Sequence, residues 1–174
     1  MSRVLRPAAF LDRDGVINVD HGYTYRPEDL TFVDGAPAAI RRLNEAGYLV
    51  VVVTNQSGVA RGYYGEADVA RFHAHMQREL AKVGARIDAF YACPYHAEGT
   101  VAAYRVDHPD RKPKPGMILR ALHQLPIDRE RSFLIGDQPS DMAAAASADI
   151  AGYPFSGGDL DDFLVTVLLQ ENAA

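Results

Sequence analysis

The chain has 174 residues, of which 48% are hydrophobic and 24% charged, and this predicts one domain over residues 1–174 with a single substantial core. Its 18 basic and 23 acidic residues give a formal net charge of -5, so nucleic acid is a poor candidate partner. The single cysteine excludes an intramolecular disulfide, and the apolar stretch broken by Arg3 and Arg6 predicts neither a signal segment nor a membrane span. We therefore expect a cytoplasmic monomer without a membrane partner.

Along the chain, apolar runs alternate between the periods of strands and helices. The β-branched run YLVVVV is typical of a strand covered on both faces in a parallel sheet. Pro115 opens a helix, since proline is tolerated in the first turn. The alternation predicts an α/β fold with a doubly wound, Rossmann-like parallel sheet. The expected strands are 7–11, 48–53, 87–93, 132–136 and 149–155, and the expected helices are 36–47, 66–83, 115–124, 139–148 and 160–170.

Polar residues follow three of these strands at the point where each strand ends. Asp12 and Asp14 follow the first strand, Thr54 the second and Asp137 the fourth. The basic segment RKPKPG lies just before a helix. Because the carboxyl ends of parallel strands line the ligand crevice of an open α/β sheet, we expect these acids, the hydroxyl and a lysine to converge.

These residue types suit phosphoryl transfer through an aspartyl phosphate. Asp12 is the expected nucleophile, and Asp14 is placed to protonate the leaving alkoxide and later to deprotonate water. Mg²⁺ bound by the acids would screen the phosphate charge from the nucleophile. Thr54 and Lys112 would hold the non-bridging phosphate oxygens.

Four motifs in order carry a resemblance to a known family. DRDGV, VVVVTNQSG, RKPKPG and LIGDQPSD resemble the four motifs of the haloacid dehalogenase superfamily of phosphatases. INVDHGYTY, TNQSGVARGYY and RKPKPGM are similar to one branch, the D-glycero-D-manno-heptose 1,7-bisphosphate 7-phosphatases, with the histidinol-phosphate phosphatases as its relatives. The resemblance covers about residues 8 to 155. A lone DxD is a weak signal, whereas the ordered set of four is specific.

The resemblance implies a role for each matching residue. It implies Asp12 as nucleophile, Asp14 as general acid and base, and Mg²⁺ bound by the side chains of Asp12 and Asp137 and by the Asp14 carbonyl. It implies a sugar phosphate as the small-molecule substrate. The expected substrate-binding residues are Asp20, His21, Gly22, Tyr23, Asn55, Gln56, Ser57, Arg111 and Gln138.

The resemblance also bears on the entrance to the site. Some superfamily members insert a cap domain after the first or the second motif. Here the interval between the first two motifs already holds a helix and a strand, so we expect no cap there. The loops at 15–34 and 93–112 would shape the entrance instead.

The chain departs from the family pattern in two places. The family commonly holds a structural zinc with a CPH segment and a CxC pair, and three of these four ligand positions are altered here. We therefore expect no zinc; the alternative is a substitute site at Cys93, His96, His108 and Asp110. The second departure is Gln138, where the branch would have lysine, and this puts the substrate in doubt more than the reaction.

Other interpretations stay open at this point. A phospho-accepting signalling domain also uses an aspartate at a strand end, and histidinol phosphate or another small sugar phosphate is the rival substrate. We interpret Asp141 as a solvated or helix-capping acid, His73 and His75 as surface or packing residues, and Tyr63 and Tyr64 as rim or lid residues.

Overall fold

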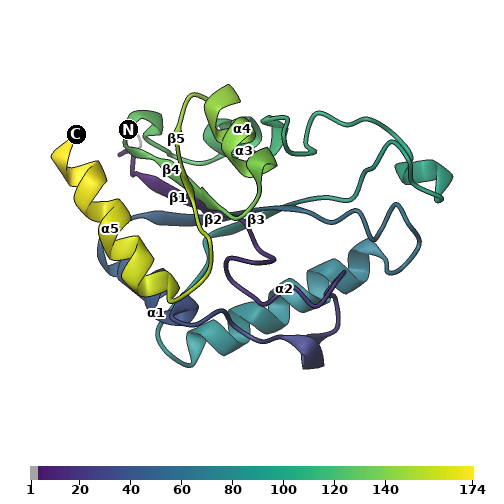
Figure 1. Cartoon of the computed structure of the whole chain (residues 1–174), viewed down its shortest axis with the longest axis horizontal. Coiled ribbons are helices and arrows are strands. Elements are labelled where there is room, and N and C mark those ends of the chain that lie inside the picture. The colour runs from purple at the N-terminus through teal and green to yellow at the C-terminus, as the bar shows by residue number, and fades with distance from the viewer. Residues whose placement is uncertain (1–3) are drawn as a thin grey trace.

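The structure is a computed structural model that describes residues 4–174, and it has a five-stranded parallel sheet between two layers of helices (Figure 1). The strand order is β3-β2-β1-β4-β5, and every pair of neighbours is parallel. The predicted doubly wound sheet is confirmed. The strands are β1 (Ala8–Leu11), β2 (Leu49–Asn55), β3 (Ala89–Cys93), β4 (Phe133–Gly136) and β5 (Ala151–Pro154).

Among residues 4–174, five α-helices cover the two faces of the sheet. They are α1 (Ala36–Glu45), α2 (Glu66–Ala81), α3 (Gly116–Gln124), α4 (Pro139–Ser147) and α5 (Leu160–Ala173). The helices α1, α2 and α5 pack on one face, and α3 and α4 pack on the other. None of the helices among residues 4–174 combines the length and the apolar character that crossing a membrane requires.

The β2 sequence explains why both faces are covered. Side chains alternate along a strand, so Val50 and Val52 enter the core on the side of α1, α2 and α5, while Val51 and Val53 enter the core on the side of α3 and α4. All four valines are fully buried. A strand that is apolar at every position therefore needs helices on both sides.

The helix ends differ slightly from the sequence-based expectation. The helix α1 ends at Glu45, two residues early, and Gly47 follows with a φ of 85°, the left-handed region that glycine adopts without strain. The helix α5 continues to Ala173, past the last apolar position that the pattern used. Three short 3₁₀ helices were not predicted, because three residues leave no measurable period: η1 (Pro27–Asp29), η2 (Ala102–Tyr104) and η3 (Arg129–Arg131).

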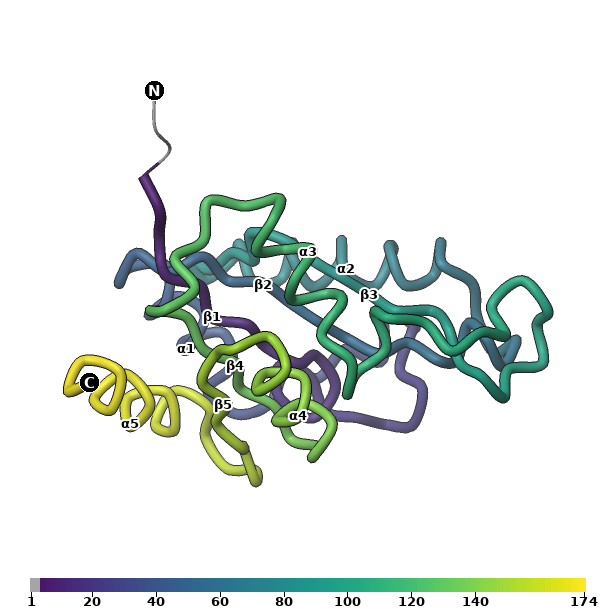
Figure 2. Tube along the Cα trace, turned by 90° about the horizontal axis from the view of Figure 1, so that it is seen from above, coloured from purple at the N-terminus to yellow at the C-terminus, as the bar shows by residue number. Residues whose placement is uncertain are grey.

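The two expected entrance loops have different positions. The segment between β1 and α1 carries η1 and passes along α2, which η1 contacts. The segment between β3 and α3 carries η2 and extends beyond the end of the sheet (Figure 2). Both segments start at the carboxyl end of a strand, where the site residues were predicted.

Candidate active site

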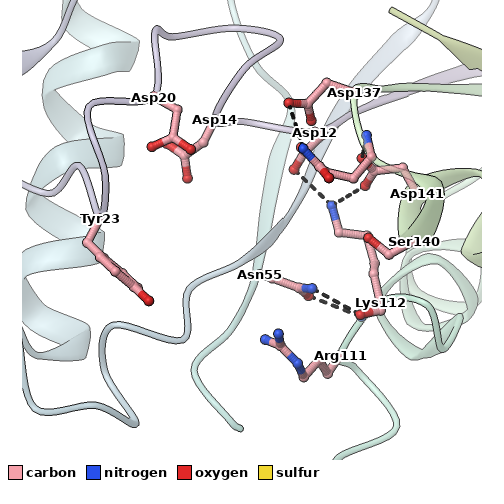
Figure 3. Close-up of a pocket in the computed structure, with 11 residues that line it drawn as sticks. Asp12, Asp14, Asp20, Tyr23, Asn55, Arg111, Lys112, Asp137, Ser140 and Asp141 are labelled. Carbon is pink, nitrogen blue, oxygen red and sulfur yellow. Dashed lines mark hydrogen bonds and ion pairs between the residues drawn. The ribbon is translucent and has the colours of Figure 1, made fainter.

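The carboxyl ends of β1, β2 and β4 lie at one edge of the sheet and open into a pocket of about 500 Å³ (Figure 3). Acids and bases from separate segments of the chain meet here. The predicted residues that line the pocket are Asp12, Asp14, Asp20, Tyr23, Asn55, Arg111, Lys112, Asp137 and Gln138. Two residues of α4 that were not predicted as site residues, Ser140 and Asp141, complete the lining.

The ammonium group of Lys112 is buried in this pocket. Its Nζ donates to Asp12 Oδ1 at 2.8 Å, to Asp141 Oδ1 at 2.5 Å and to the Val53 carbonyl at 2.9 Å. Desolvation by itself would lower the pKa of Lys112, but the carboxylates of Asp12 and Asp141 raise this pKa above its ordinary value. The lysine is therefore held as a cation beside the expected nucleophile.

Asn55, the last residue of β2, fixes the main chain of Lys112. Its Nδ2 donates to the Lys112 carbonyl at 3.1 Å, and its Oδ1 accepts from the Lys112 N–H at 3.0 Å. This two-point contact ties the basic segment to the edge of the sheet. The Asn55 carboxamide is thus used by the main chain, although the residue lines the pocket.

The carboxyl group of Asp12 lies where burial and charge oppose its ionisation. Burial raises its pKa to about 8; Lys112 opposes this shift and Asp141 adds to it. Asp137 Oδ1 is buried as well, with no hydrogen-bond partner among residues 4–174. Buried acceptors normally have partners, so this group of acids can bind a cation in addition to Lys112.

The geometry of these acids suits a metal ion. Asp12, Asp137 and Asp141 each offer an oxygen, and the three oxygens lie within 4.8 Å of one another; in the described part of the chain this is the one such group of His, Cys, Asp or Glu side chains. Gly15 leaves the space open, since a Cβ there would lie 2.2 Å from Asp137 Oδ2. Carboxylate oxygens are the ligands that Mg²⁺ prefers, so the residues present fit this ion.

Both oxygens of the Asp14 carboxylate accept hydrogen bonds. Oδ1 accepts from Arg13 Nη2 at 2.8 Å, from Arg13 Nε at 3.1 Å and from Asn18 Nδ2 at 2.9 Å. Oδ2 accepts from Gln56 Nε2 at 3.0 Å. Because Oδ1 carries most of the donors, Oδ2 is the oxygen that has capacity left for a substrate or water.

Arg13, which presents its guanidinium to Asp14, is itself fully buried. The guanidinium lies 4.5 Å from the centre of the Phe72 ring, and Nη1 lies 3.2 Å from His73 Nε2. Burial lowers the pKa of His73 to about 3, with a contribution from Arg13, so the imidazole is neutral and its Nε2 accepts a hydrogen bond from Arg13 Nη1. Of the two interpretations of His73, packing is correct and surface exposure is wrong, since the residue is buried and stacks on Phe90.

Five predicted residues do not line the pocket: His21, Gly22, Thr54, Gln56 and Ser57. Thr54 and Gln56 are buried directly behind Asp14, where Gln56 Nε2 donates to Thr54 Oγ1 at 2.8 Å. His21 and Gly22 are exposed on the loop that follows β1. Their neighbours Asp20 and Tyr23 do line the pocket, and the Tyr23 ring packs edge-on against the Tyr63 ring with centroids 4.8 Å apart.

The solvated position expected for Asp141 is wrong. The residue is 1% exposed and contacts Lys112, because the third position of α4 faces back toward the ends of the strands. The capping role is correct, since Oδ2 accepts from the Gln138 N–H at 3.0 Å. The sequence signal that could have placed Asp141 in the site is its spacing of one helical turn after Asp137. Sequence reasoning missed Arg13 and Asn18, because their types carry no signature outside the fold. Tyr64, interpreted as a rim or lid residue, is buried and lies outside the pocket lining.

The altered zinc positions lie where the segment between β3 and α3 begins and ends. The His108 ring stacks on Tyr95 at 4.2 Å, and His108 Nδ1 accepts from the Asp110 N–H at 3.0 Å. Cys93 Sγ lies 4.0 Å from the Tyr95 carbonyl, and burial raises the pKa of the Cys93 thiol. The ring stacking of Tyr95 and His108 joins the two ends of the segment, and each of the other contacts lies within one end.

Two arginines next to the pocket have unused donors. Arg111 Nη1 and Arg61 Nε are buried and have no hydrogen-bond partner among residues 4–174. Burial lowers the pKa of Arg111, and the charge of Arg61 contributes to the same shift. Because Arg111 lines the pocket, its guanidinium is available to an anion that enters there.

Comparison of the sequence with known proteins decides the family. Residues 10–153 match the family described as polynucleotide kinase 3 phosphatase. The chain is 53% identical over 169 residues to the D-glycero-beta-D-manno-heptose-1,7-bisphosphate 7-phosphatase of Rhodopseudomonas palustris, which covers 97% of this chain and 94% of that protein. The chain belongs to this family of heptose bisphosphate phosphatases. It is 45% identical over 144 residues to the protein of the same name in Escherichia coli strain K12, across 83% of this chain and 75% of that one.

Solved structures agree with this assignment. A putative haloacid dehalogenase-like phosphatase from Mesorhizobium loti has a TM-score of 0.87 and 38% identity, over 98% of this chain and 89% of that one. The D,D-heptose 1,7-bisphosphate phosphatase from B. bronchiseptica, solved with magnesium and phosphate, has a TM-score of 0.83 and 30% identity, over 94% of this chain and 99% of that one. The protein is thus a phosphoric monoester hydrolase of the haloacid dehalogenase type. The family predicted from the four motifs is confirmed, and the enzyme is favoured over the signalling domain.

Proposed function

We propose that the protein removes the 7-phosphate of D-glycero-D-manno-heptose 1,7-bisphosphate, with Mg²⁺ as cofactor and phospho-Asp12 as intermediate. The observation that carries this proposal is that one pocket joins the carboxylate of Asp12 to the unpaired guanidinium of Arg111. The names of the relatives that cover most of the chain support it. Histidinol phosphate and other small sugar phosphates are the alternative substrates.

The unpaired buried oxygen Asp137 Oδ1 and the group of three carboxylates support a metal site. We assign Mg²⁺ to the side chains of Asp12 and Asp137 and to the main-chain carbonyl of Asp14. When bound, Mg²⁺ screens the phosphate charge from the attacking carboxylate. Asp141 bonds to Lys112 and so holds the lysine at the pocket. The magnesium and phosphate in the B. bronchiseptica enzyme support the assignment.

The first half-reaction forms the bond between Asp12 and phosphorus. A carboxylate oxygen of Asp12 attacks the phosphorus, and the bond from phosphorus to the sugar oxygen breaks. The sugar oxygen leaves with the electron pair and takes a proton from Asp14. We assign Lys112 and Thr54 to the non-bridging oxygens, whose charge grows in this step. Lys112 would exchange one of its present acceptors for the phosphate, and Thr54, which is buried outside the pocket lining, would contact a phosphate that enters as far as its hydroxyl.

The second half-reaction restores the enzyme. Water attacks the phosphorus, Asp14 accepts its proton, and the bond to Asp12 breaks, which releases inorganic phosphate and the free carboxylate. We assign the proton that Asp14 carries to Oδ2, because Arg13 and Asn18 already donate to Oδ1. The same oxygen therefore gives a proton in the first step and accepts one in the second.

Arg111 is the group proposed to select a bisphosphate. A second phosphate on the sugar would meet its unpaired guanidinium, whereas a monophosphate would leave that charge unpaired in a partly buried position. The positive charge of Arg61 contributes to the lowered pKa of Arg111, so the two guanidinium groups are close enough to share in attracting an anion. A bisphosphate should therefore exceed the matching monophosphate in kcat/KM by more than about tenfold.

The test compares kcat/KM for the heptose bisphosphate, its monophosphate, fructose 1,6-bisphosphate and histidinol phosphate. Arg111→Met should lose the preference for the bisphosphate over the monophosphate. Arg105→Met serves as the control, because Arg105 is exposed and lies in the same segment outside the pocket lining. Faster hydrolysis of fructose 1,6-bisphosphate or of histidinol phosphate would contradict the heptose assignment and would leave the phosphatase assignment in place.

A further inference from the structure

Gln56 was expected to contact the substrate, yet its carboxamide is fully used inside the protein. The residue is 2% exposed. Its Oε1 accepts from Tyr64 Oη at 2.6 Å, while its Nε2 donates to Thr54 Oγ1 at 2.8 Å and to Asp14 Oδ2 at 3.0 Å. One NH₂ group thus contacts both the expected general acid and base and the expected phosphate ligand.

The two ends of a carboxamide differ, so its orientation decides what Asp14 meets. If Gln56 were turned over, Oε1 would lie against Asp14 Oδ2. Two acceptors would then face each other whenever Asp14 is ionised, and Oε1 would accept the proton meant for the leaving oxygen whenever Asp14 is protonated. Thr54 Oγ1 would also lose its donor and would have to spend its own proton on Gln56. In the orientation seen here the hydroxyl proton of Thr54 stays free for a phosphate oxygen.

Tyr64 is the group that selects this orientation. Its hydroxyl has one proton to give, and Gln56 Oε1 is its acceptor. Burial raises the pKa of Tyr64 to about 12, so the hydroxyl keeps its proton over the working pH range. A donor at this place favours the amide oxygen and disfavours the amide NH₂ beside it.

The position of Tyr64 is in turn fixed by its surroundings. The ring stacks on Tyr25 with centroids 4.8 Å apart and planes at 21°. It fills the space that Gly58 leaves free, since a Cβ at Gly58 would lie 2.2 Å from the ring. A rigidly held hydroxyl can orient its acceptor, whereas a mobile one would follow it.

We propose that Tyr64 is a positioning residue, which fixes the Gln56 carboxamide so that a single NH₂ group orients both Asp14 and Thr54. The proposal rests on the roles proposed above for Asp14 and Thr54. It replaces the expected substrate contact of Gln56 by an internal role. It also gives a function to Tyr64, which lies outside the pocket lining.

Tyr64→Phe removes the hydroxyl and keeps the ring. We expect kcat to fall about tenfold, the value of one hydrogen bond that orients a charged group, while KM changes less than about twofold. Tyr91→Phe is the matched control, because Tyr91 Oη also donates to a glutamine Oε1, that of Gln124, at 2.7 Å, in a hydrogen bond that is exposed to solvent. An unchanged kcat in Tyr64→Phe, or a rise of KM alone, would overturn the proposal.

A double-mutant cycle tests whether Tyr64 acts through Gln56. Gln56→Met should lower kcat at least as much as Tyr64→Phe, and adding Tyr64→Phe to Gln56→Met should cause less than about a twofold further loss. If the double variant lost kcat by the product of the two single losses, Tyr64 would act separately from Gln56, and the proposal would be overturned. Thermal unfolding of each variant shows that the assays are made on folded protein.

The substrate for these assays is the phosphomonoester that the wild-type protein hydrolyses fastest. The ratios between variants then do not depend on the heptose assignment. Asp14→Asn is measured in parallel. If Asp14→Asn keeps the wild-type kcat, the proposed acid and base role fails; if Asp14→Asn loses activity and Tyr64→Phe does not, only the positioning role fails.

Discussion

Asp141 Oδ1 lies 2.5 Å from Lys112 Nζ, and the two side chains are 1% and 3% exposed. A buried charge that loses its partner is costly, because water cannot replace the contact. Asp141 also caps α4 through the Gln138 N–H. The Asp141 carboxylate therefore holds the Lys112 ammonium group and also fixes the first turn of α4.

Asp141→Ala should lower the free energy of unfolding by about 3 kcal/mol, since it leaves Lys112 with one buried carboxylate and removes a cap. Urea unfolding at neutral pH measures this change. Asp161→Ala is the control: it breaks the more exposed ion pair with Arg42 and should cost about 1 kcal/mol or less. Equal losses in the two variants would contradict the role given to the buried pair.

Asp12→Asn should abolish turnover, because an amide cannot form the acyl phosphate. Asp14→Asn should slow kcat by about a hundredfold or more, since the leaving oxygen loses its proton donor while the nucleophile remains. Steady-state kinetics and trapping of the phosphorylated protein measure both effects. If Asp12→Asn turned over substrate at the wild-type rate, Asp12 would be excluded as the nucleophile.

Removal of divalent metal by EDTA should inactivate the enzyme, and added Mg²⁺ should restore it. Mg²⁺ should also raise the thermal midpoint of the substrate-free protein, because a ligand present at about 100 times its Kd stabilises the folded state by about 2.7 kcal/mol. Asp137→Asn and Gly15→Ala should reduce this shift, the first by removing a ligand and the second by placing a Cβ against Asp137. Full activity in excess EDTA would rule out the metal requirement.

His73 should make the protein less stable in mild acid. Its folded pKa of about 3 lies below the ordinary value of 6.5, so the unfolded chain binds more protons between these values. This contribution to stability is complete above pH 6.5 and is lost as the pH falls, with a slope of up to about 1.4 kcal/mol per pH unit. His73→Gln should flatten the pH dependence of urea unfolding in this window. A slope equal to that of the wild type would contradict the burial of a neutral imidazole.

Purified protein should carry no stoichiometric zinc. One thiolate with loosely spaced histidines makes a weak site, and burial favours the neutral thiol of Cys93. In this structure the Tyr95 and His108 rings stack across the altered positions. Metal analysis of the wild type and of Cys93→Ala measures the zinc content. About one zinc per chain, lost in the variant, would show that the substitute site binds metal.

Local sequence patterns are enough to predict the fold class and the edge of the sheet at which the site lies. A run such as LVVVV in β2 can be satisfied only with helices on both faces, and the alternation of strands and helices then places Asp12, Thr54 and Asp137 at the same ends of parallel strands. These are local patterns with short periods. Because the helical pattern has a period of a few residues, the helix ends are predicted to within a few residues. The 3₁₀ helices are too short to show a period and are not predicted.

Which polar residues are buried, and which partners they have, depends on the packing of segments that are distant in the chain. Asp141 and Lys112 are 29 residues apart in the chain, and Gln56 and Asp14 are 42 apart, yet each pair forms a hydrogen bond. No local pattern records such contacts, because they depend on how separate segments pack at the edge of the sheet. The same packing turned Gln56 inward, left His21 on the surface and buried the charge of Arg13 behind Asp14.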